Sequence, residues 1–188
     1  LSMKEENSYK NIHQHYIDAC RNGDSKAQFE IYRLYYKAMY NTSLRIVGDE
    51  QEAEDIMQES FFKAFDKIST YKNEVSFGAW LRRIVVNTSI DALKKKRITL
   101  IPIEEAYGID TESADDAEFT VETIELFKSA IEKLPEGYRL VLNLHLIEEL
   151  DHDEIASKLG IAASTSRSQL ARAKQKLIEI IKSNKNTK

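Results

Sequence analysis

Apolar residues recur at the three- and four-residue spacing of an amphipathic helix in two long stretches of this chain. In the first stretch the pattern predicts helices over about 11–22, 25–47, 49–68 and 76–97. In the second stretch it predicts helices over about 119–134, 135–146, 151–159 and 164–182. Glycine and proline fall mostly between these segments, and no β-hairpin pattern is present. The predicted fold class is therefore all-α.

The two helical stretches are separated by residues 98–118, which show no sustained period. This segment contains Pro102, Gly108, seven acidic residues and no basic residue. We expect it to be a flexible acidic linker that joins two small helical domains, residues 8–97 and 119–183. The linker accounts for the net charge of −4, because each domain is close to neutral. Local basic clusters therefore matter more than the total charge.

The composition excludes several kinds of protein and site. The single cysteine, Cys20, cannot form a disulfide framework or a cysteine-based zinc site. The chain has no run of about 18 apolar residues that could insert into a membrane. It also has no apolar signal core, so we expect a cytoplasmic protein. Glycine-rich phosphate loops and nucleophile elbows are absent, and we expect neither an enzyme nor a cofactor. Glu149 and His152 have the spacing of a di-iron ligand pair, but without a second such pair we expect no metal site.

The strongest local pattern is a helix-turn-helix over residues 150–177. A short helix with a small apolar face is followed by Gly160, which permits a tight turn, and Ser164 or Thr165 can cap the next helix. The buried stripe of that helix consists of Leu170, Ala173, Leu177 and Ile181. Its opposite face carries Ser164, Ser168, Ala171, Arg172 and Gln175, with Arg167 at the edge. Such a face suits the major groove of DNA, and the alternative is a helical hairpin with a solvated basic face.

The predicted helix over 49–68 places an aromatic side chain among acids. Helical geometry puts Asp55, Gln58 and Glu59 on its polar side, and Phe62 falls on that side too. An exposed phenylalanine beside carboxylates suggests a protein partner. The alternative is a lone surface aromatic residue, which needs no functional explanation.

The predicted helix over 76–97 carries six basic residues and one acid between Arg82 and Arg97. One stripe of this helix consists of Arg83, Asn87, Asp91 and Lys94, with Trp80 at its N-terminal end. The preceding loop, 71–76, is polar and has Tyr71 at its edge. Aromatic, amide and cationic groups together suit an unstacked base and its phosphates. The alternative is that Trp80 belongs to the core and the terminal lysines only match the helix C-terminus.

Together these three segments, in this order and over residues 27–181, resemble bacterial RNA polymerase sigma factors of the extracytoplasmic-function (ECF) group. The resemblance implies that the first domain binds core RNA polymerase and the −10 promoter element, and that the second binds the −35 element. It implies polymerase contacts by Asp55, Gln58 and Glu59, and we expect Phe62, on the same side of the helix, to join them. The expected −10 contacts are Tyr71, Ser76, Arg83, Asn87 and Lys94. The expected −35 contacts are Ser164, Thr165, Arg167, Ser168 and Arg172.

Two residues of the last helix depart from the family pattern. Ser166 stands where the family usually has an apolar residue, and Gln169 stands where a basic residue is common. We expect the buried Ser166 hydroxyl to bond a backbone carbonyl of its own helix, and the −35 consensus to differ from the usual one. The expected function is a promoter-specificity subunit whose partners are core polymerase, promoter DNA and an anti-sigma factor. The alternative is a stand-alone helix-turn-helix regulator.

Overall fold

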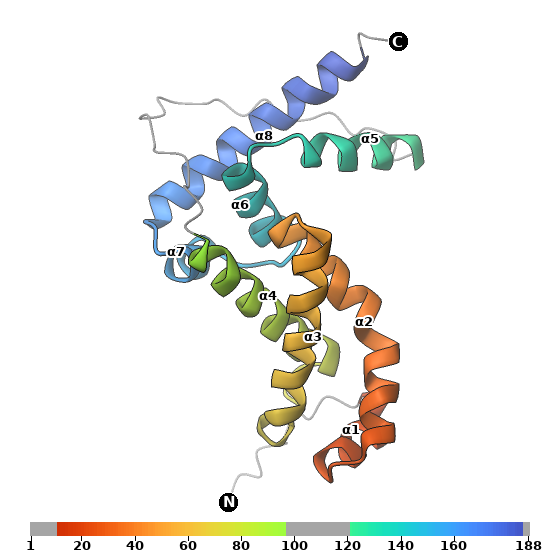
Figure 1. Cartoon of the computed structure of the whole chain (residues 1–188). Helices are drawn as coiled ribbons and strands as arrows, with labels where there is room; N and C mark the ends of the chain where they lie inside the picture. Colours follow the sequence, from red (N-terminus) through yellow and green to blue (C-terminus); the bar gives the residue numbers. More distant parts are fainter. Residues whose placement is uncertain (1–10, 97–120, 186–188) are drawn as a thin grey trace, which may run out of the picture. The chain divides into compact units, whose positions relative to one another are not determined.

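The structure, a computed structural model, describes residues 11–96 and 121–185, with side chains given for 11–96 and 125–184. The described residues contain helices and no strand, which confirms the all-α prediction. The chain divides into two compact units, residues 1–96 and 97–188, called here the N-terminal unit and the C-terminal unit (Figure 1). The predicted linker, 98–118, lies outside the described residues.

The N-terminal unit is built on three long helices that pack against one another, with a short helix against the first of them (Figure 1). Its elements are α1 (Gln14–Arg21), α2 (Ser25–Val47), α3 (Glu50–Asp66), the 3₁₀ turn η1 (Ile68–Thr70) and α4 (Phe77–Lys95). Apolar side chains from every element meet in one core, in which Ile31, Phe61 and Leu81 are fully or almost fully buried. This packing fixes which faces of α3 and α4 remain exposed.

Polar side chains define where these helices begin. The Asp24 carboxylate accepts hydrogen bonds from the backbone N–H groups of Lys26 and Ala27 at the start of α2. Asp49 caps α3 and Ser76 caps α4 in the same way. Such caps satisfy N–H groups that have no partner within the helix. The boundaries of α3 and α4 are therefore set locally by the sequence.

The C-terminal unit contains a helix-turn-helix, as the sequence predicts. Its helices are α5 (Val121–Glu132), α6 (Glu136–Leu146), α7 (His152–Leu159) and α8 (Ala163–Lys185). Asp151 and Glu154 form a reciprocal capping box at the start of α7, and Gly160 ends the helix in the left-handed conformation at φ 70°. Helices α5, α6 and α7 each pack against α8. Among the described residues, no helix is long and apolar enough to cross a membrane.

Candidate polymerase and DNA interfaces

The exposed side of α3 carries the acidic residues and the aromatic residue that the sequence indicates. Asp55, Gln58 and Glu59 are exposed, and Phe62 keeps 75% of its surface accessible. The Glu59 carboxylate pairs with Lys63 at 2.8 Å, one helical turn away. Both partners of this pair are solvated, so it adds little to stability. The residues of this face are therefore available to a partner at low cost.

A groove of about 700 Å³ lies beside this face, between α2 and α3. Its walls include Phe29 and Tyr32 from α2, and Phe61, Phe62 and Phe65 from α3. Phe29 is 63% exposed, so exposed aromatic rings come from both helices. Phe29 was not expected at the surface, because it shares helical spacing with Tyr32 and Tyr36 of α2. A signal that could have placed Phe29 at the surface is its two-residue spacing from the apolar Ile31, because residues two apart point to different sides of a helix.

On α4, the predicted stripe is exposed at all four positions: Arg83, Asn87, Asp91 and Lys94. Trp80 is half-buried and packs against Phe77 and Tyr71, with ring centroids 5.5 and 5.2 Å apart. The tryptophan therefore anchors the start of α4 to the core. The polar stripe begins beyond it and offers cations and one amide to solvent.

The loop before α4 corrects one sequence expectation. Tyr71 is only 3% exposed, so its ring cannot stack on a base in this conformation. The Tyr71 hydroxyl instead donates a hydrogen bond to the Val75 carbonyl at 2.6 Å. Ser76 is half-buried and caps α4 through the Ala79 N–H. Tyr71 and Ser76 therefore stabilise the loop and the start of α4 through local hydrogen bonds.

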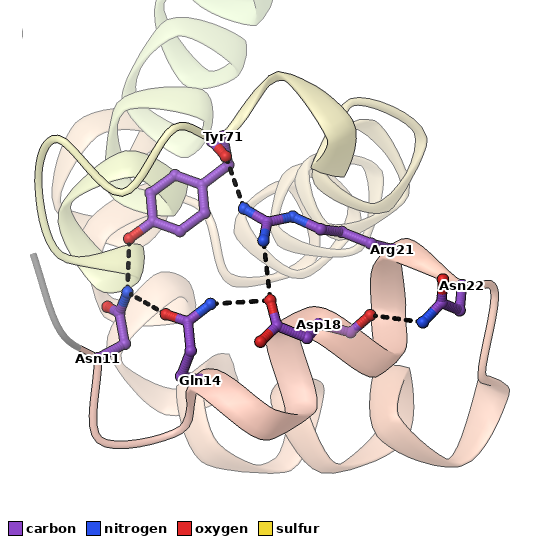
Figure 2. Close-up of polar contacts among 6 residues, drawn as sticks. All are labelled: Asn11, Gln14, Asp18, Arg21, Asn22 and Tyr71. Atoms are coloured by element: carbon purple, nitrogen blue, oxygen red, sulfur yellow. Dashed lines mark hydrogen bonds and ion pairs between the residues drawn. The ribbon is translucent and has the colours of Figure 1, made fainter. Parts of the chain in front are cut away.

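Tyr71 is also held by residues that the sequence analysis did not single out (Figure 2). Asn11 donates a hydrogen bond to the Tyr71 hydroxyl, and Arg21 donates one to the Tyr71 carbonyl. Because these partners lie 60 and 50 residues from Tyr71 in the chain, no local pattern could reveal the contacts.

In the C-terminal unit, α8 begins one residue earlier than its predicted cap. The Ser166 N–H donates to the Ala162 carbonyl, so Ser164 and Thr165 lie inside the first turn and do not cap the helix. Ser164 and Arg167 are exposed. Thr165, Ser168 and Arg172 are half-buried, and the Ser168 hydroxyl donates to the Thr165 carbonyl. The face of α8 that was predicted to be solvent-exposed is therefore only partly exposed.

Ser166 is fully buried, but its hydroxyl does not bond a carbonyl of its own helix. It lies 2.9 Å from Nδ1 of His152, the first residue of α7. The His152 ring stacks on His145 with centroids 4.5 Å apart, and His145 Nδ1 donates to the Leu150 carbonyl. Burial lowers the pKa of His152, and the nearby His145 and Arg167 lower it further, against the opposing effect of Asp151 and Asp153. The contact between His152 and Ser166 joins α7 to α8.

Of the residues Gln169 and Glu149, the first is buried and the second is exposed. Gln169 is 3% exposed and faces the interior of the unit, so it does not replace a basic DNA contact. Glu149 is exposed, with φ 57°, in the loop before α7. Within the ranges described, no three His, Cys, Asp or Glu side chains gather as metal ligands would.

A basic helix anchored by aromatic packing in one unit and a helix-turn-helix in the other are features typical of proteins that bind nucleic acid. Two family models match the chain: sigma-70 region 2 over residues 31–98 and sigma-70 region 4 over residues 124–177. The ECF RNA polymerase sigma factor SigW of Bacillus subtilis is 31% identical over 172 residues, which is 86% of this chain and 92% of that protein. The chain therefore belongs to the sigma-70 family, in its ECF group.

Two further comparisons are with a curated relative and with a solved structure, and the second bears on the fold alone. The RNA polymerase sigma-H factor of Pseudomonas aeruginosa is 28% identical and spans 86% of this chain and 90% of its own. The structure of CnrH in complex with the cytosolic domain of CnrY matches the fold with a TM-score of 0.50 at 20% identity. That match covers 91% of this chain and 97% of CnrH.

Proposed function

We propose that this chain is a promoter-specificity subunit of bacterial RNA polymerase. Its N-terminal unit binds core polymerase and the −10 element, and its C-terminal unit binds the −35 element. The observation that carries the proposal is the presence of both sigma-70 regions, in order, in one chain. The family consists of promoter-specificity subunits and not of enzymes, so promoter DNA opens by binding energy alone.

The polymerase-binding surface is the exposed face of α3 with the adjoining groove. Phe62 and Phe29 supply exposed apolar area, and Asp55, Gln58 and Glu59 give the surface an acidic edge. A partner of matching chemistry presents apolar side chains with basic residues around them. A stand-alone helix-turn-helix regulator has no use for such a surface, and this separates the two functions.

The −10 element is held by the exposed stripe of α4. The Asn87 amide hydrogen-bonds an unstacked base, while Arg83 and Lys94 meet the phosphates on either side. The loop 71–76, placed directly before this helix, forms the wall of the pocket. Capture of an unpaired base favours the open form of DNA, because the duplex form has no base to offer.

The −35 element is bound by the first turns of α8. Arg167 is exposed, and with Ser164 and Thr165 it meets backbone phosphate near the helix N-terminus. Ser168 is small and lets the helix approach the base edges, which Arg172 reaches from the next turn. An anti-sigma factor is the proposed regulator, and it competes for the surfaces that polymerase and DNA use.

The test of this function is core-dependent transcription by a variant that lacks the α3 surface. Glu59→Lys with Phe62→Ala should abolish core binding, since loss of an interface anchor costs about 2–4 kcal/mol. The matched control is Glu179→Lys with Phe127→Ala, which changes a solvated ion pair and an exposed ring in the C-terminal unit. The control should bind core polymerase as the wild type does.

Two results would reject the proposal. One is wild-type core affinity in the α3 variant. The other is a wild-type protein that gives no promoter-specific transcripts with core polymerase but binds a palindromic operator as a dimer. The second result identifies the stand-alone regulator, because operator symmetry follows dimer symmetry.

A further inference from the structure

We infer that Asn11, three residues before α1, and Arg21, the last residue of α1, are positioning residues for −10 recognition. They hold Tyr71 and so fix the backbone of the loop 71–76 in the shape that receives an unstacked base. This inference rests on the proposed function of that loop. Helix α1 precedes the sigma-70 region 2 match, which starts at residue 31, so the match assigns it no role.

The Asn11 side chain connects the two ends of the loop. Its Nδ2 donates to the Tyr71 hydroxyl at 2.8 Å, and its Oδ1 accepts from the Phe77 N–H at 2.8 Å. Nδ2 also donates to Gln14 Oε1 at 3.1 Å, so both amide protons and the carbonyl oxygen have partners. Asn11 is 7% exposed, and the bonds to Tyr71 and Phe77 are shielded from water. Phe77 is the first residue of α4, so Asn11 also ties the start of that helix, which Ser76 caps, to the segment before α1.

Tyr71 passes this constraint on to the loop. Its hydroxyl accepts from Asn11 and donates to the Val75 carbonyl at 2.6 Å. Its ring packs against Trp80 and Phe77, so the hydroxyl has a fixed position from which to act. The two hydrogen bonds of one phenolic oxygen therefore set the separation between Asn11 and the end of the loop.

Arg21 holds the other side of Tyr71. Its Nη2 donates to the Tyr71 carbonyl at 2.7 Å, and its Nη1 pairs with Asp18 at 2.8 Å. Asp18 also accepts from Gln14 Nε2 at 2.9 Å. The contacts thus close into a ring that runs from Asn11 through Gln14, Asp18 and Arg21 to Tyr71 and back (Figure 2).

This ring constrains the loop at three backbone groups: the Tyr71 and Val75 carbonyls and the Phe77 N–H. Between them, Asn73 adopts a left-handed conformation at φ 59°, which asparagine tolerates better than most residues and which gives the loop its turn. Hydrogen bonds fix direction as well as distance, so they can define a pocket that apolar packing alone would leave loose. A pocket held in its bound shape loses less entropy when it captures a base.

The experiment compares Tyr71→Phe, Asn11→Ala and Arg21→Ala in the full chain with core polymerase. Tyr71→Phe keeps the buried ring and removes only the hydroxyl, and Arg21→Lys keeps a cationic donor as the conservative variant. Each protein transcribes a library of duplex promoters randomised at the −10 element, and a second library randomised at the −35 element. Ser43→Ala is the matched control, because it removes a buried hydroxyl that bonds the Ala53 carbonyl far from this loop.

We expect Tyr71→Phe and Asn11→Ala to reduce −10 base discrimination by about tenfold, the change that corresponds to about 1.4 kcal/mol. Arg21→Ala should do the same and Arg21→Lys should recover most of it. Preference at the −35 element and affinity for core polymerase should stay at wild-type values in every variant. The loss should be smaller on templates already unpaired at the −10 element, where the base is available without melting.

The inference is overturned if Tyr71→Phe and Arg21→Ala keep the wild-type −10 preference. It is also overturned if they lower −10 and −35 activities equally, as Ser43→Ala would do through stability alone. Failure of the proposed function is separate: then the wild-type protein itself shows no −10 preference, and Asn87→Ala changes nothing.

Discussion

The contact between Ser166 and His152 allows a prediction for the stability of the helix-turn-helix. Ser166→Ala removes the hydroxyl and leaves His152 Nδ1 facing a methyl group, 2.9 Å from where its partner stood. Since Ser166 is fully buried, water cannot take the place of the lost group from the α8 side. The change therefore tests whether this polar contact holds α7 against α8.

The expected cost follows from the burial of the two partners. A net hydrogen bond contributes about 1 kcal/mol, and a partner left unsatisfied in the interior raises the cost toward 3 kcal/mol. His152 is half-buried and so can recover part of this by bonding water, which places the expected loss at about 1–2 kcal/mol. For a helical unit of this size, each kcal/mol lowers the melting temperature by about 4–8 °C.

The assay is a double-mutant cycle on the full chain. Ser166→Ala, His152→Ala and the double variant are compared by hydrogen-exchange protection of peptides from α7 and α8, which isolates the C-terminal unit from the N-terminal one. The coupling energy should be about 0.5–1.5 kcal/mol. Ser183→Ala is the control, because it removes an exposed hydroxyl of the same helix and should change stability by less than about 0.5 kcal/mol.

A coupling energy of zero would refute this reasoning. The two residues would then contribute independently, and the stability of the turn would come from apolar packing around Ile155 and Ala173. An increase in stability for Ser166→Ala would refute this reasoning more strongly. The desolvation free energy of the buried hydroxyl would then exceed the stabilisation from its hydrogen bond.

Three other predictions concern single residues. Because burial and the neighbours of His152 lower its pKa from 6.5, the unfolded state binds the proton more readily. Stability of the C-terminal unit should therefore fall as pH drops below this value, and His152→Gln should reduce the slope in a pH series of thermal melts. Gly160→Ala should cost about 1–2 kcal/mol in chemical denaturation, through its left-handed backbone alone, because a Cβ there meets open space. Burial and Asp24 raise the pKa of Cys20 to about 11, so a thiol reagent at mildly alkaline pH should label it only in denaturant, and rapid labelling of the native protein would contradict its burial.

The helices were predictable because their signals are local. The predicted segment 25–47 coincides with α2, and 76–97 exceeds α4 by one residue at its start and two at its end. Apolar spacing, the turn glycines Gly23, Gly48 and Gly160, and the caps at Asp24, Asp49 and Ser76 all lie within a few residues of the helix boundaries. The same applies to the helix-turn-helix, whose Gly160 turn was evident from the sequence.

The misplaced side chains depend on contacts between distant segments. Angular placement on a helix shows which residues share a face, but it does not show which neighbour covers that face. Tyr71 was expected at the surface and is buried, because α1 and α4 close over it. Phe29 shares helical spacing with Tyr32 and Tyr36 of α2, and yet it is exposed beside α3. Gln169 is buried although its residue type favours the surface.

In both units, a side chain from an earlier segment of the chain forms a hydrogen bond at the start of the proposed DNA-binding helix. In the N-terminal unit, Asn11 bonds the first residue of α4; in the C-terminal unit, His152 bonds Ser166 in the first turn of α8. Each bond comes from an earlier segment of the chain and is shielded from water on at least one side. Apolar packing stabilises many nearly equivalent arrangements of two elements. A buried hydrogen bond stabilises only those within a narrow range of distances and angles. A helix start that must meet a base or a phosphate within a fraction of an ångström needs that second kind of constraint. The polar residues Asn11 and Ser166 are therefore best explained by the position they impose on a helix, because an apolar side chain of similar volume would pack there without fixing its direction.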